Sequence, residues 1–461
     1  MNAFDVSKAT SLHVWYLGNP ASPVLTGTVS LIPGSRRCSF IYDDSWLRSG
    51  FSLSPDLQID RVGRGKIILP PGDAALHGAL DDASPDRWGQ ETIKSLDRPK
   101  RSLPFDFLYL AGDRRWGALG ISSSRDEYLP YPAPPLITAA SLSEANAVIE
   151  RIASRQPLND IEKRMLQSGR SPGGAQPKML VDIDGEEWIA KFPNSSTTDH
   201  CLIEYAAMRL AASLGINVPE VKAIPVGFEH VVLSKRFDRE AGRRIHALSA
   251  KTMLAGRGES YATISSVLRD VAPAAEVSGQ RRELFRRMVF NILLDNTDDH
   301  TKNHAFLRDP DGSYRLSPAY DIPPQMNGMG RQAIPVAEGC DADDLAAIMA
   351  NAGSFGLPGA GLAEEMVTLA RGLGKWKDVF EEAGVSGADI DYLAEFIDSE
   401  EKLAIRGAAE KVVLGVAQPP RSRSLSELAE RTRRSLSSPP PDPAALSAKG
   451  RDKPDSGSEP G

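Results

Sequence analysis

The sequence has few cysteines and no excess of basic residues. Its three cysteines, at positions 38, 201 and 340 of 461 residues, are odd in number and far apart. This spacing excludes a disulfide framework and a zinc site of the CxxC type, and it suits a reducing compartment. The formal net charge of −7 at pH 7 argues against a whole surface that binds nucleic acid.

Long apolar runs are also missing. No stretch of 18 apolar residues occurs, so the sequence predicts no membrane-spanning helix and no membrane partner. The opening "MNAFDVSKATSLHVWYLG" lacks the basic segment and following apolar segment that are typical of a signal peptide. We therefore expect a cytoplasmic protein.

What is present is the composition of a globular enzyme, with 41% hydrophobic and 25% charged residues in a chain long enough for two folding units. The patterns predict an α+β protein. Residues 1–127 form a β-rich unit, and the proline-dense stretch after them is a linker. A second unit spans residues 139–417 and turns from a small β-rich part to a mainly helical part at about residue 250. Residues 418–461 are rich in Pro, Ser and charge, which predicts a disordered tail.

Three local sequence patterns predict the helices and strands on which the motifs lie. In "DDASPDRWGQETIKSL" a helix is expected to begin at Pro85 with Ser84 as its N-cap. Residues 178–193 predict a β-hairpin that turns at Gly185. A helix follows and should end at Gly215.

The stretch "SGRSPGGAQPK", residues 168–178, precedes this hairpin. Its small residues would let backbone N–H groups approach a phosphate closely, although it is neither a Walker A motif nor GxGxxG. A flexible surface loop is the alternative interpretation.

Lys191 in "WIAKFP" falls on the second strand of the hairpin, and Glu204 falls in the next helix on a mostly apolar face. A buried carboxylate requires a cationic partner. A strand lysine followed by a helix glutamate is the order found in protein kinases, whose Lys–Glu ion pair orders the nucleotide phosphates. Each residue alone favours a purely structural interpretation, such as a strand lysine that faces solvent, and only the two together favour a kinase-like pair.

In "NTDDHTKN", Asp298 and Asn303 are five positions apart, and Asp321 follows in "AYDIPP" after two short strand-like runs. In kinases an aspartate accepts the proton of the substrate hydroxyl, and an asparagine five residues later binds Mg²⁺. A further carboxylate completes the magnesium site. The set therefore predicts a phosphotransfer site.

A metal-dependent hydrolase is the competing interpretation, because His300 and His304 are four residues apart. The general base of an HExxH motif is missing between them, however, and Lys302 would repel a dication.

The motifs "SPGGAQPK", "WIAKFP", "EYAAMRLAASLGINVPEV", "NTDDHTKN" and "PAYDIPP", in this order, resemble the HipA family of bacterial serine/threonine kinases. These kinases are the toxin halves of HipBA-type toxin–antitoxin modules. "LDDASPDRWGQ" is similar to the family's N-terminal domain, so the resemblance covers about residues 10–400. It implies that the second unit is a bilobal protein-kinase-like domain.

The resemblance also implies a role for each matching residue, with ATP and Mg²⁺ as cofactors. Asp298 would be the catalytic base, and Asn303 and Asp321 would bind the metal. Ser171 would be autophosphorylated, which switches the family's kinases off. The residues expected to contact ATP are Ser171, Gly173, Gly174, Ala175, Gln176, Lys178, Lys191, Glu204, His300 and Lys302.

The partners that the resemblance implies are a HipB-like helix-turn-helix antitoxin and a protein substrate, an aminoacyl-tRNA synthetase such as glutamyl-tRNA synthetase. DNA would be reached only through the antitoxin, in agreement with the acidic charge. A catalytically silent corepressor that binds the antitoxin is a further alternative, although such a scaffold would not need the Lys191, Asp298, Asn303 and Asp321 set.

Overall fold

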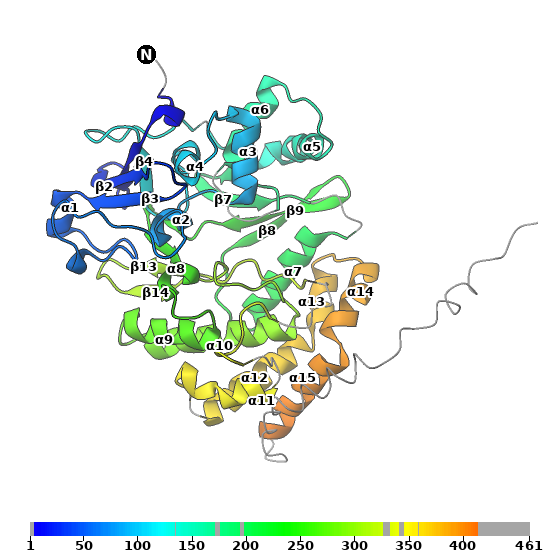
Figure 1. Ribbon diagram of the computed structural model, residues 1–461. Helices are drawn as coiled ribbons and strands as arrows, with labels where there is room; N and C mark the ends of the chain where they lie inside the picture. The colour runs from blue at the N-terminus through cyan, green and yellow to red at the C-terminus, as the bar shows by residue number, and fades with distance from the viewer. Residues whose placement is uncertain are drawn as a thin grey trace, which may run out of the picture. The chain divides into compact units, whose positions relative to one another are not determined.

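The computed structural model describes residues 4–133, 135–170, 176–193, 198–325, 332–340, 345–357 and 359–413. Residues Met1–Gln418 form one compact unit. We divide its described part into an N-terminal region (residues 4–133), a small lobe (135–238) and a helical lobe (239–413), which Figure 1 shows in order from blue to orange. The sequence predictions for residues 171–175 and for the tail 418–461 lie outside the described residues.

The N-terminal region contains an antiparallel four-stranded sheet in the order β3-β2-β1-β4. Its strands are β1 Ser11–Tyr16, β2 Val24–Leu31, β3 Cys38–Tyr42 and β4 Leu119–Ser122. Its α-helices are α1 Asp44–Ser49, α2 Gly78–Asp82, α3 Arg87–Asp97 and α4 Pro104–Leu110. Apolar strand residues such as Leu12, Val14 and Phe40 are fully buried, as the alternation of a half-buried strand requires.

One prediction for this region is wrong. Helix α3 begins at Arg87 rather than Pro85, and its N-cap is Asp86 rather than Ser84. The Ser84 hydroxyl donates a hydrogen bond to the Leu80 carbonyl, 2.8 Å away, so it is engaged with the preceding turn. Asp86 keeps an extended backbone, so the helix cannot start before it, and aspartate is as good an N-cap residue as serine.

The small lobe is built on a five-stranded sheet in the order β5-β6-β7-β9-β8. Its strands are β5 Ile137–Thr138, β6 Lys178–Ile183, β7 Glu186–Lys191, β8 Val221–Val226 and β9 Glu229–Lys235, and its helices are α5 Leu142–Ala153, α6 Asp160–Leu166 and α7 His200–Ser213. The predicted hairpin is confirmed, because β6 pairs antiparallel with β7 around Gly185, whose φ is +82°. Gly215, with φ of +74°, follows the end of α7 as predicted.

The helical lobe contains a three-stranded sheet, β12-β13-β14, and eight described α-helices, of which α9, α10, α11, α12 and α15 lie below the sheet in Figure 1. The strands are β12 Ala247–Ser249, β13 Ala305–Arg308 and β14 Tyr314–Leu316, with β10 Arg239–Glu240 and β11 Arg243–Arg244 forming a separate ribbon before them. The helices are α8 Ala250–Leu254, α9 Tyr261–Val271, α10 Val277–Leu293, α11 Leu345–Ala350, α12 Gly359–Leu373, α13 Trp376–Glu382, α14 Gly387–Ile397 and α15 Glu400–Val413. Among the described residues, no helix is long and apolar enough to cross a membrane.

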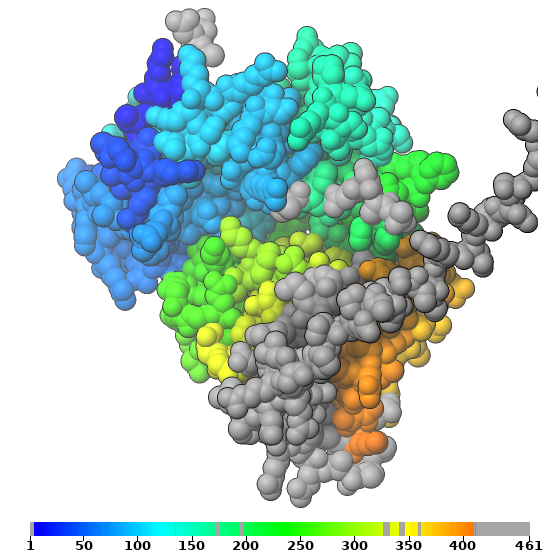
Figure 2. All heavy atoms as spheres, turned by 45° about the vertical axis from the view of Figure 1, so that its right-hand side comes forward, coloured from blue at the N-terminus to red at the C-terminus, as the bar shows by residue number. Residues whose placement is uncertain are grey.

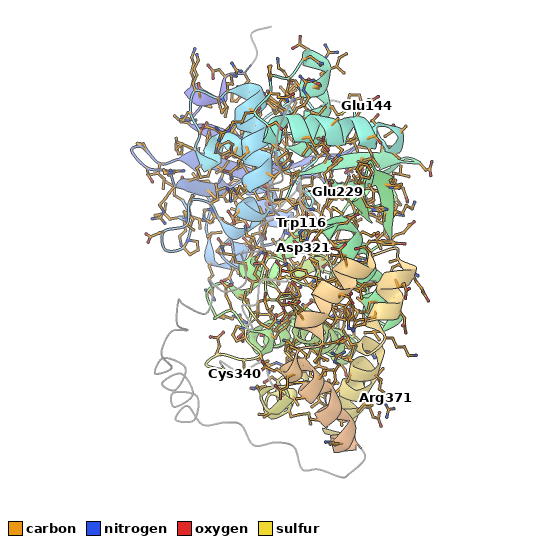
Figure 3. All side chains as sticks on the ribbon, turned by 90° about the vertical axis from the view of Figure 1, so that its right-hand side faces the viewer. Trp116, Glu144, Glu229, Asp321, Cys340 and Arg371 are labelled. Carbon is orange, nitrogen blue, oxygen red and sulfur yellow. The ribbon has the colours of Figure 1, made fainter. Side chains whose placement is uncertain are left out.

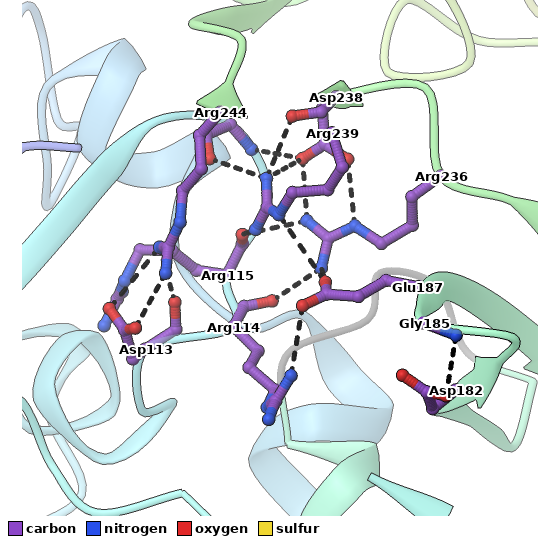
Figure 4. Close-up of polar contacts among 11 residues, drawn as sticks. Asp113, Arg114, Arg115, Asp182, Gly185, Glu187, Arg236, Asp238, Arg239 and Arg244 are labelled. Carbon is purple, nitrogen blue, oxygen red and sulfur yellow. Dashed lines mark hydrogen bonds and ion pairs between the residues drawn. The ribbon is translucent and has the colours of Figure 1, made fainter. Parts of the chain in front are cut away.

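A buried ion network joins the N-terminal region to the segment that connects the lobes, residues 236–238, which we call the hinge (Figure 4). Asp238, 1% exposed, lies 2.7 Å from Arg236 and 2.9 Å from Arg239, and it accepts a hydrogen bond from the Gly117 amide. Burial opposes ionisation of Asp238, but the two guanidinium groups outweigh it and lower the pKa of Asp238 well below its usual range. Arg236 also donates to the carbonyl of Arg114.

We expect Asp238→Ala to lower the free energy of unfolding by about 3–5 kcal/mol, because it removes the most buried carboxylate of the network and leaves Arg236 and Arg239 to share Glu187, at 2.9 and 3.5 Å. The matched control is Glu186→Ala, which breaks the partly exposed Lys235–Glu186 pair of 2.6 Å and should cost less than about 1 kcal/mol. Urea denaturation of both variants measures the difference. Equal losses would show that the hinge network does not stabilise the fold.

Candidate functional site

A cleft of about 460 Å³ is lined by residues from all three parts of the described structure. The small lobe contributes Lys178, Lys191 and Glu204, and the hinge contributes Phe237. The helical lobe contributes His300, Lys302, Asn303, Tyr320 and Asp321. The N-terminal region contributes Asp81, Asp82, Ser84, Asp86, Arg87, Arg114 and Trp116.

Lys191 lies at the centre of the charged side chains in this cleft. Its Nζ atom is 2.6 Å from Glu204 Oε1 and 2.8 Å from Asp321 Oδ1. Strand β7, helix α7 and the segment after β14 thus contribute one group each, although Lys191 and Asp321 are 130 positions apart. The Lys–Glu pair that the sequence predicted is present, and one ammonium also bridges the lobes.

The charges of Lys191, Glu204 and Asp321 shift one another's pKa values. Burial favours the neutral forms and raises the pKa of Glu204, which Lys191 only partly offsets. Burial would also raise the pKa of Asp321, but the Lys191 and Lys178 ammonium groups outweigh it and lower the pKa of Asp321 to about 2. The Asp321 side chain is 42% exposed, so water screens part of this effect. At neutral pH Asp321 is a carboxylate, the form that binds a cation.

Lys178 is opposite Lys191 in the β6–β7 ladder, and both line the cleft. Burial, followed by repulsion from Lys191, lowers the pKa of Lys178, which is only 4% exposed. Two neighbouring ammonium groups on the floor of a cleft favour an anionic ligand, because such a ligand relieves their repulsion.

The segment that follows α10 carries the other predicted residues, and we call residues 297–304 the catalytic loop after the role that the sequence predicts for them. Asn303 is buried and lines the cleft, and its backbone N–H donates a hydrogen bond to the His300 carbonyl at 2.8 Å. Asp298 is exposed and is not among the residues that line the cleft. In a kinase the base meets a hydroxyl that arrives from outside, so an exposed position suits this role.

A buried network of hydrogen bonds attaches the catalytic loop to helices α9 and α10. Asp299 accepts a hydrogen bond from the Tyr261 hydroxyl and lies 3.0 Å from His304 Nε2. The Asn291 amide in turn donates to the Tyr261 hydroxyl at 3.0 Å. These hydrogen bonds link Asp299, Tyr261, His304 and Asn291 in one arrangement, although Asp299 Oδ1 and His304 Nδ1 have no hydrogen-bond partner among the described residues. His304 is therefore engaged in loop structure, whereas His300 is exposed beside the cleft.

Asp321 has an unusual backbone. Its φ of +58° lies in the left-handed region, which costs a non-glycine residue roughly 1–2 kcal/mol. The Lys191 ion pair and a 3.4 Å hydrogen bond from the Asn296 amide to the Asp321 carbonyl hold it there. Strained residues of this kind concentrate at functional sites.

The remaining predicted positions belong to the stretch that precedes strand β6. The Gln176 side chain donates to the Phe192 carbonyl at 2.9 Å and is not among the residues that line the cleft. Ser171, Gly173, Gly174 and Ala175 lie outside the described residues.

Sequence reasoning missed the contribution of the N-terminal region to the cleft. Trp116 and Asp321 are both labelled near the centre of Figure 3, and both line the cleft. Burial raises the pKa of Asp86, another lining residue, to about 6. The signal was the "LDDASPDRWG" stretch, whose density of charged residues exceeds what a helix start needs.

The N-terminal region approaches the small lobe closely at α3. The Trp88 indole donates to the Lys178 carbonyl at 2.8 Å. A Cβ on Gly89 would collide with the Arg170 carbonyl oxygen, so only glycine permits this approach. Figure 2 shows the blue and cyan residues packed against the green ones.

The donor set fits magnesium held between protein and phosphate oxygens. Within the residues that the structure describes, no three His, Cys, Asp or Glu side chains gather as an all-protein metal site. Mg²⁺ in kinases takes only one or two protein oxygens and completes its shell with phosphates and water. The Asn303 amide and the Asp321 carboxylate offer such oxygens in one cleft.

Known families match both parts of the chain. The HipA-like C-terminal domain matches residues 170–374, and the HipA N-terminal domain matches residues 14–122. The serine/threonine-protein kinase toxin HipA of Shewanella oneidensis is 26% identical over 318 residues, 61% of this chain and 68% of that protein. Y4dM of Sinorhizobium fredii is 26% identical over 244 residues, 48% of this chain and 56% of that protein. The matches thus span between about half and two thirds of these curated relatives.

A solved structure shares the fold. A chain of the complex of Shewanella oneidensis HipA, HipB and operator DNA has a TM-score of 0.59 and 19% identity, and the match covers 88% of this chain and 99% of that one. Fold and cleft together define a protein of the kinase-like class, and the predicted α+β, bilobal architecture is confirmed. The chain belongs to the HipA family, as its motifs predicted, and it is homologous to a serine/threonine-protein kinase toxin.

We expect Lys191→Met to lower the free energy of unfolding by about 2 kcal/mol at neutral pH, because it removes charge-assisted hydrogen bonds to two carboxylates. The depressed pKa of Asp321 gives the sign of the pH dependence. The contribution of the ion pair is present above the ordinary aspartate pKa of 3.8 and is lost as the pH falls towards about 2. The difference from wild type should therefore shrink over that range in urea denaturation series.

The control is Lys251→Met, which removes an exposed lysine of α8. Its effect should be small and independent of pH. A pH-independent deficit in Lys191→Met would contradict the assigned ion pair.

Proposed function

We propose that the protein is a serine/threonine-protein kinase toxin that transfers the γ-phosphoryl group of ATP to a protein hydroxyl. The observation that carries the proposal is the contact of Lys191 with both Glu204 and Asp321 inside the cleft. A lysine that a helix glutamate holds beside a metal-binding aspartate is the arrangement that orders ATP phosphates in kinases. We further propose that residues 1–127 and 139–417 are the two domains.

Each group has one task in the proposed reaction. Lys191 and Lys178 bind the phosphates, and Glu204 orients Lys191. Asp298 orients the substrate hydroxyl and accepts its proton as the oxygen forms a bond to the γ-phosphorus and the bond to ADP breaks. Asn303 and Asp321 would hold Mg²⁺, which neutralises the charge that develops on the phosphate oxygens.

Autophosphorylation of Ser171 would switch the kinase off. A phosphoryl group carries close to two negative charges at neutral pH. Placed beside a site built for ATP phosphates, it would compete for Lys178 and Lys191 and displace the loop that carries it.

We propose a HipB-like helix-turn-helix antitoxin as the partner and an aminoacyl-tRNA synthetase, such as glutamyl-tRNA synthetase, as the substrate of this cytoplasmic enzyme. The support is the family membership together with the relative whose solved complex contains HipB and operator DNA. Phosphorylation of a synthetase would arrest growth and lead to persistence.

Incubation with Mg²⁺ and γ-labelled ATP tests the reaction. We expect label on Ser171 in the wild type and at least about a hundredfold less in Asp298→Asn, which cannot accept the proton. The control is Asp311→Asn, an exposed aspartate in the β13–β14 turn that should leave labelling unchanged.

Each alternative gives its own result in this assay. Equal labelling of wild type and Asp298→Asn would refute the assignment of the base. No labelling of any variant would favour the corepressor that binds an antitoxin without catalysis. Release of free phosphate with no labelled protein would favour the metal-dependent hydrolase.

The substrate is tested separately with purified glutamyl-tRNA synthetase. Wild-type protein should label the synthetase, and Lys191→Met should label it at least about a hundredfold less, because the phosphates lose their main cationic contact. Labelled Ser171 beside an unlabelled synthetase would reject this substrate and leave the kinase assignment intact.

A further inference from the structure

We propose that helix α2 of the N-terminal region positions the catalytic loop, with Asp81 and Asp82 as positioning residues. The inference rests on the proposed kinase function, in which this loop carries the base and one metal ligand. It assigns the N-terminal region a direct part in catalysis.

Asp82 reaches the helical lobe through two hydrogen bonds. Its Oδ2 atom accepts from the Ser249 amide at 2.8 Å, and its Oδ1 atom accepts from the Ser249 hydroxyl at 2.6 Å. These residues are 167 positions apart, so the contact joins two distant parts of the chain. A carboxylate that accepts two hydrogen bonds from one residue in a partly buried setting restricts the position of that residue.

Ser249 passes this constraint to the catalytic loop. It is the N-cap of α8, and its hydroxyl accepts a hydrogen bond from the Thr252 amide. The next two amides point at the loop: Ala250 donates to the His304 carbonyl at 2.7 Å, and Lys251 donates to the Thr301 carbonyl at 3.2 Å. The path from Asp82 to the loop backbone therefore contains a single intermediate residue and the start of one helix.

Asp81 makes a second, direct contact. Its Oδ2 atom lies 2.9 Å from the Lys302 ammonium, next to Asn303 in sequence. The Lys302 carbonyl accepts a hydrogen bond of 2.7 Å from the Tyr320 hydroxyl, so residue 302 is held from two sides. Both side chains of the Asp81–Lys302 pair are nearly half exposed, which makes this contact weaker than that of Asp82.

Helix α2 is itself fixed within the N-terminal region, because Ala79 and Leu80 are buried in the core. The hinge is held by the same region through Asp238 and the Gly117 amide. One region thus constrains both the hinge and the loop that border the cleft. A displacement of a reacting group by about 1 Å costs on the order of a hundredfold in rate, so this constraint bears on turnover.

The test uses the full chain and measures phosphotransfer kinetics with hydrogen exchange of residues 297–304. Asp82→Ala should lower kcat about tenfold or more through loop misplacement. Its KM for ATP should stay within about twofold, because the lysines that bind the phosphates are untouched. Exchange in the catalytic loop should become faster. Asp82→Asn should recover most of kcat, since its amide can accept from the Ser249 amide and donate to the Ser249 hydroxyl.

Asp81→Asn provides a second variant for the case that Asp82→Ala does not fold. The Asp81 side chain is 48% exposed, so folding should be unaffected. We expect kcat to fall by about two- to fivefold, which corresponds to the loss of one exposed ion pair. The control is Asp106→Asn, in a buried pair with Arg101 at 2.7 Å inside the N-terminal region. This control should lower stability but leave kcat and loop exchange unchanged.

Wild-type kcat and wild-type loop exchange in the Asp82 and Asp81 variants would overturn the proposed positioning and leave the kinase assignment standing. Equal losses of kcat in Asp106→Asn would also overturn it, because general destabilisation would then explain the effect. A wild type that transfers no phosphoryl group would instead remove the kinase function, and the exchange data alone would then decide whether α2 orders the loop.

Discussion

The whole site depends on one ammonium group that contacts two carboxylates from different lobes. Lys191 lies 2.6 Å from Glu204 and 2.8 Å from Asp321, and burial by itself would raise the pKa of both carboxyl groups. The Lys191 ammonium holds strand β7, helix α7 and Asp321 in place relative to one another. Its positive charge also lowers the electrostatic repulsion between Glu204 and Asp321. In the proposed function Glu204 stays on Lys191 and orients it, while Lys191 and the neighbouring Lys178 present the positive charge that would bind a phosphate chain. The ion pair that joins the lobes would thus also place the cation that recognises the ligand.

The N-terminal region is part of this arrangement, since it lines the cleft, packs Trp88 against the Lys178 carbonyl and holds the hinge, whose Arg236 donates to the carbonyls of Arg114 and Arg115. Buried charge pairs of this kind give specificity of arrangement more than net stability. We infer that the buried Asp238–Arg236 pair fixes the hinge in one position, and that this role offsets the free energy needed to remove both charges from water. The N-terminal and kinase-like parts therefore behave as one structural unit.

Much of the site could be predicted from the sequence, because Lys191, Glu204, Asn303 and Asp321 follow the order found in protein kinases, and the structure brings all four to one cleft. The hairpin was predictable from Gly185 and its flanking strands. The contacts of Asp81 and Asp82 with the helical lobe were not, since more than 160 positions separate the partners and no local pattern encodes such pairing. The N-cap of α3 was assigned wrongly because Ser and Asp are equally good caps, and only the contact of Ser84 with Leu80 decides between them.

The central claim is that triphosphate and metal meet at Lys191. A crystal structure with Mg²⁺ and a non-hydrolysable ATP analogue tests it most directly. We predict phosphate oxygens within hydrogen-bonding distance of Lys191 Nζ, and a metal ion bound by Asn303 and Asp321 between them. A nucleotide bound elsewhere, or a cleft that stays empty when the analogue is saturating, would contradict the account.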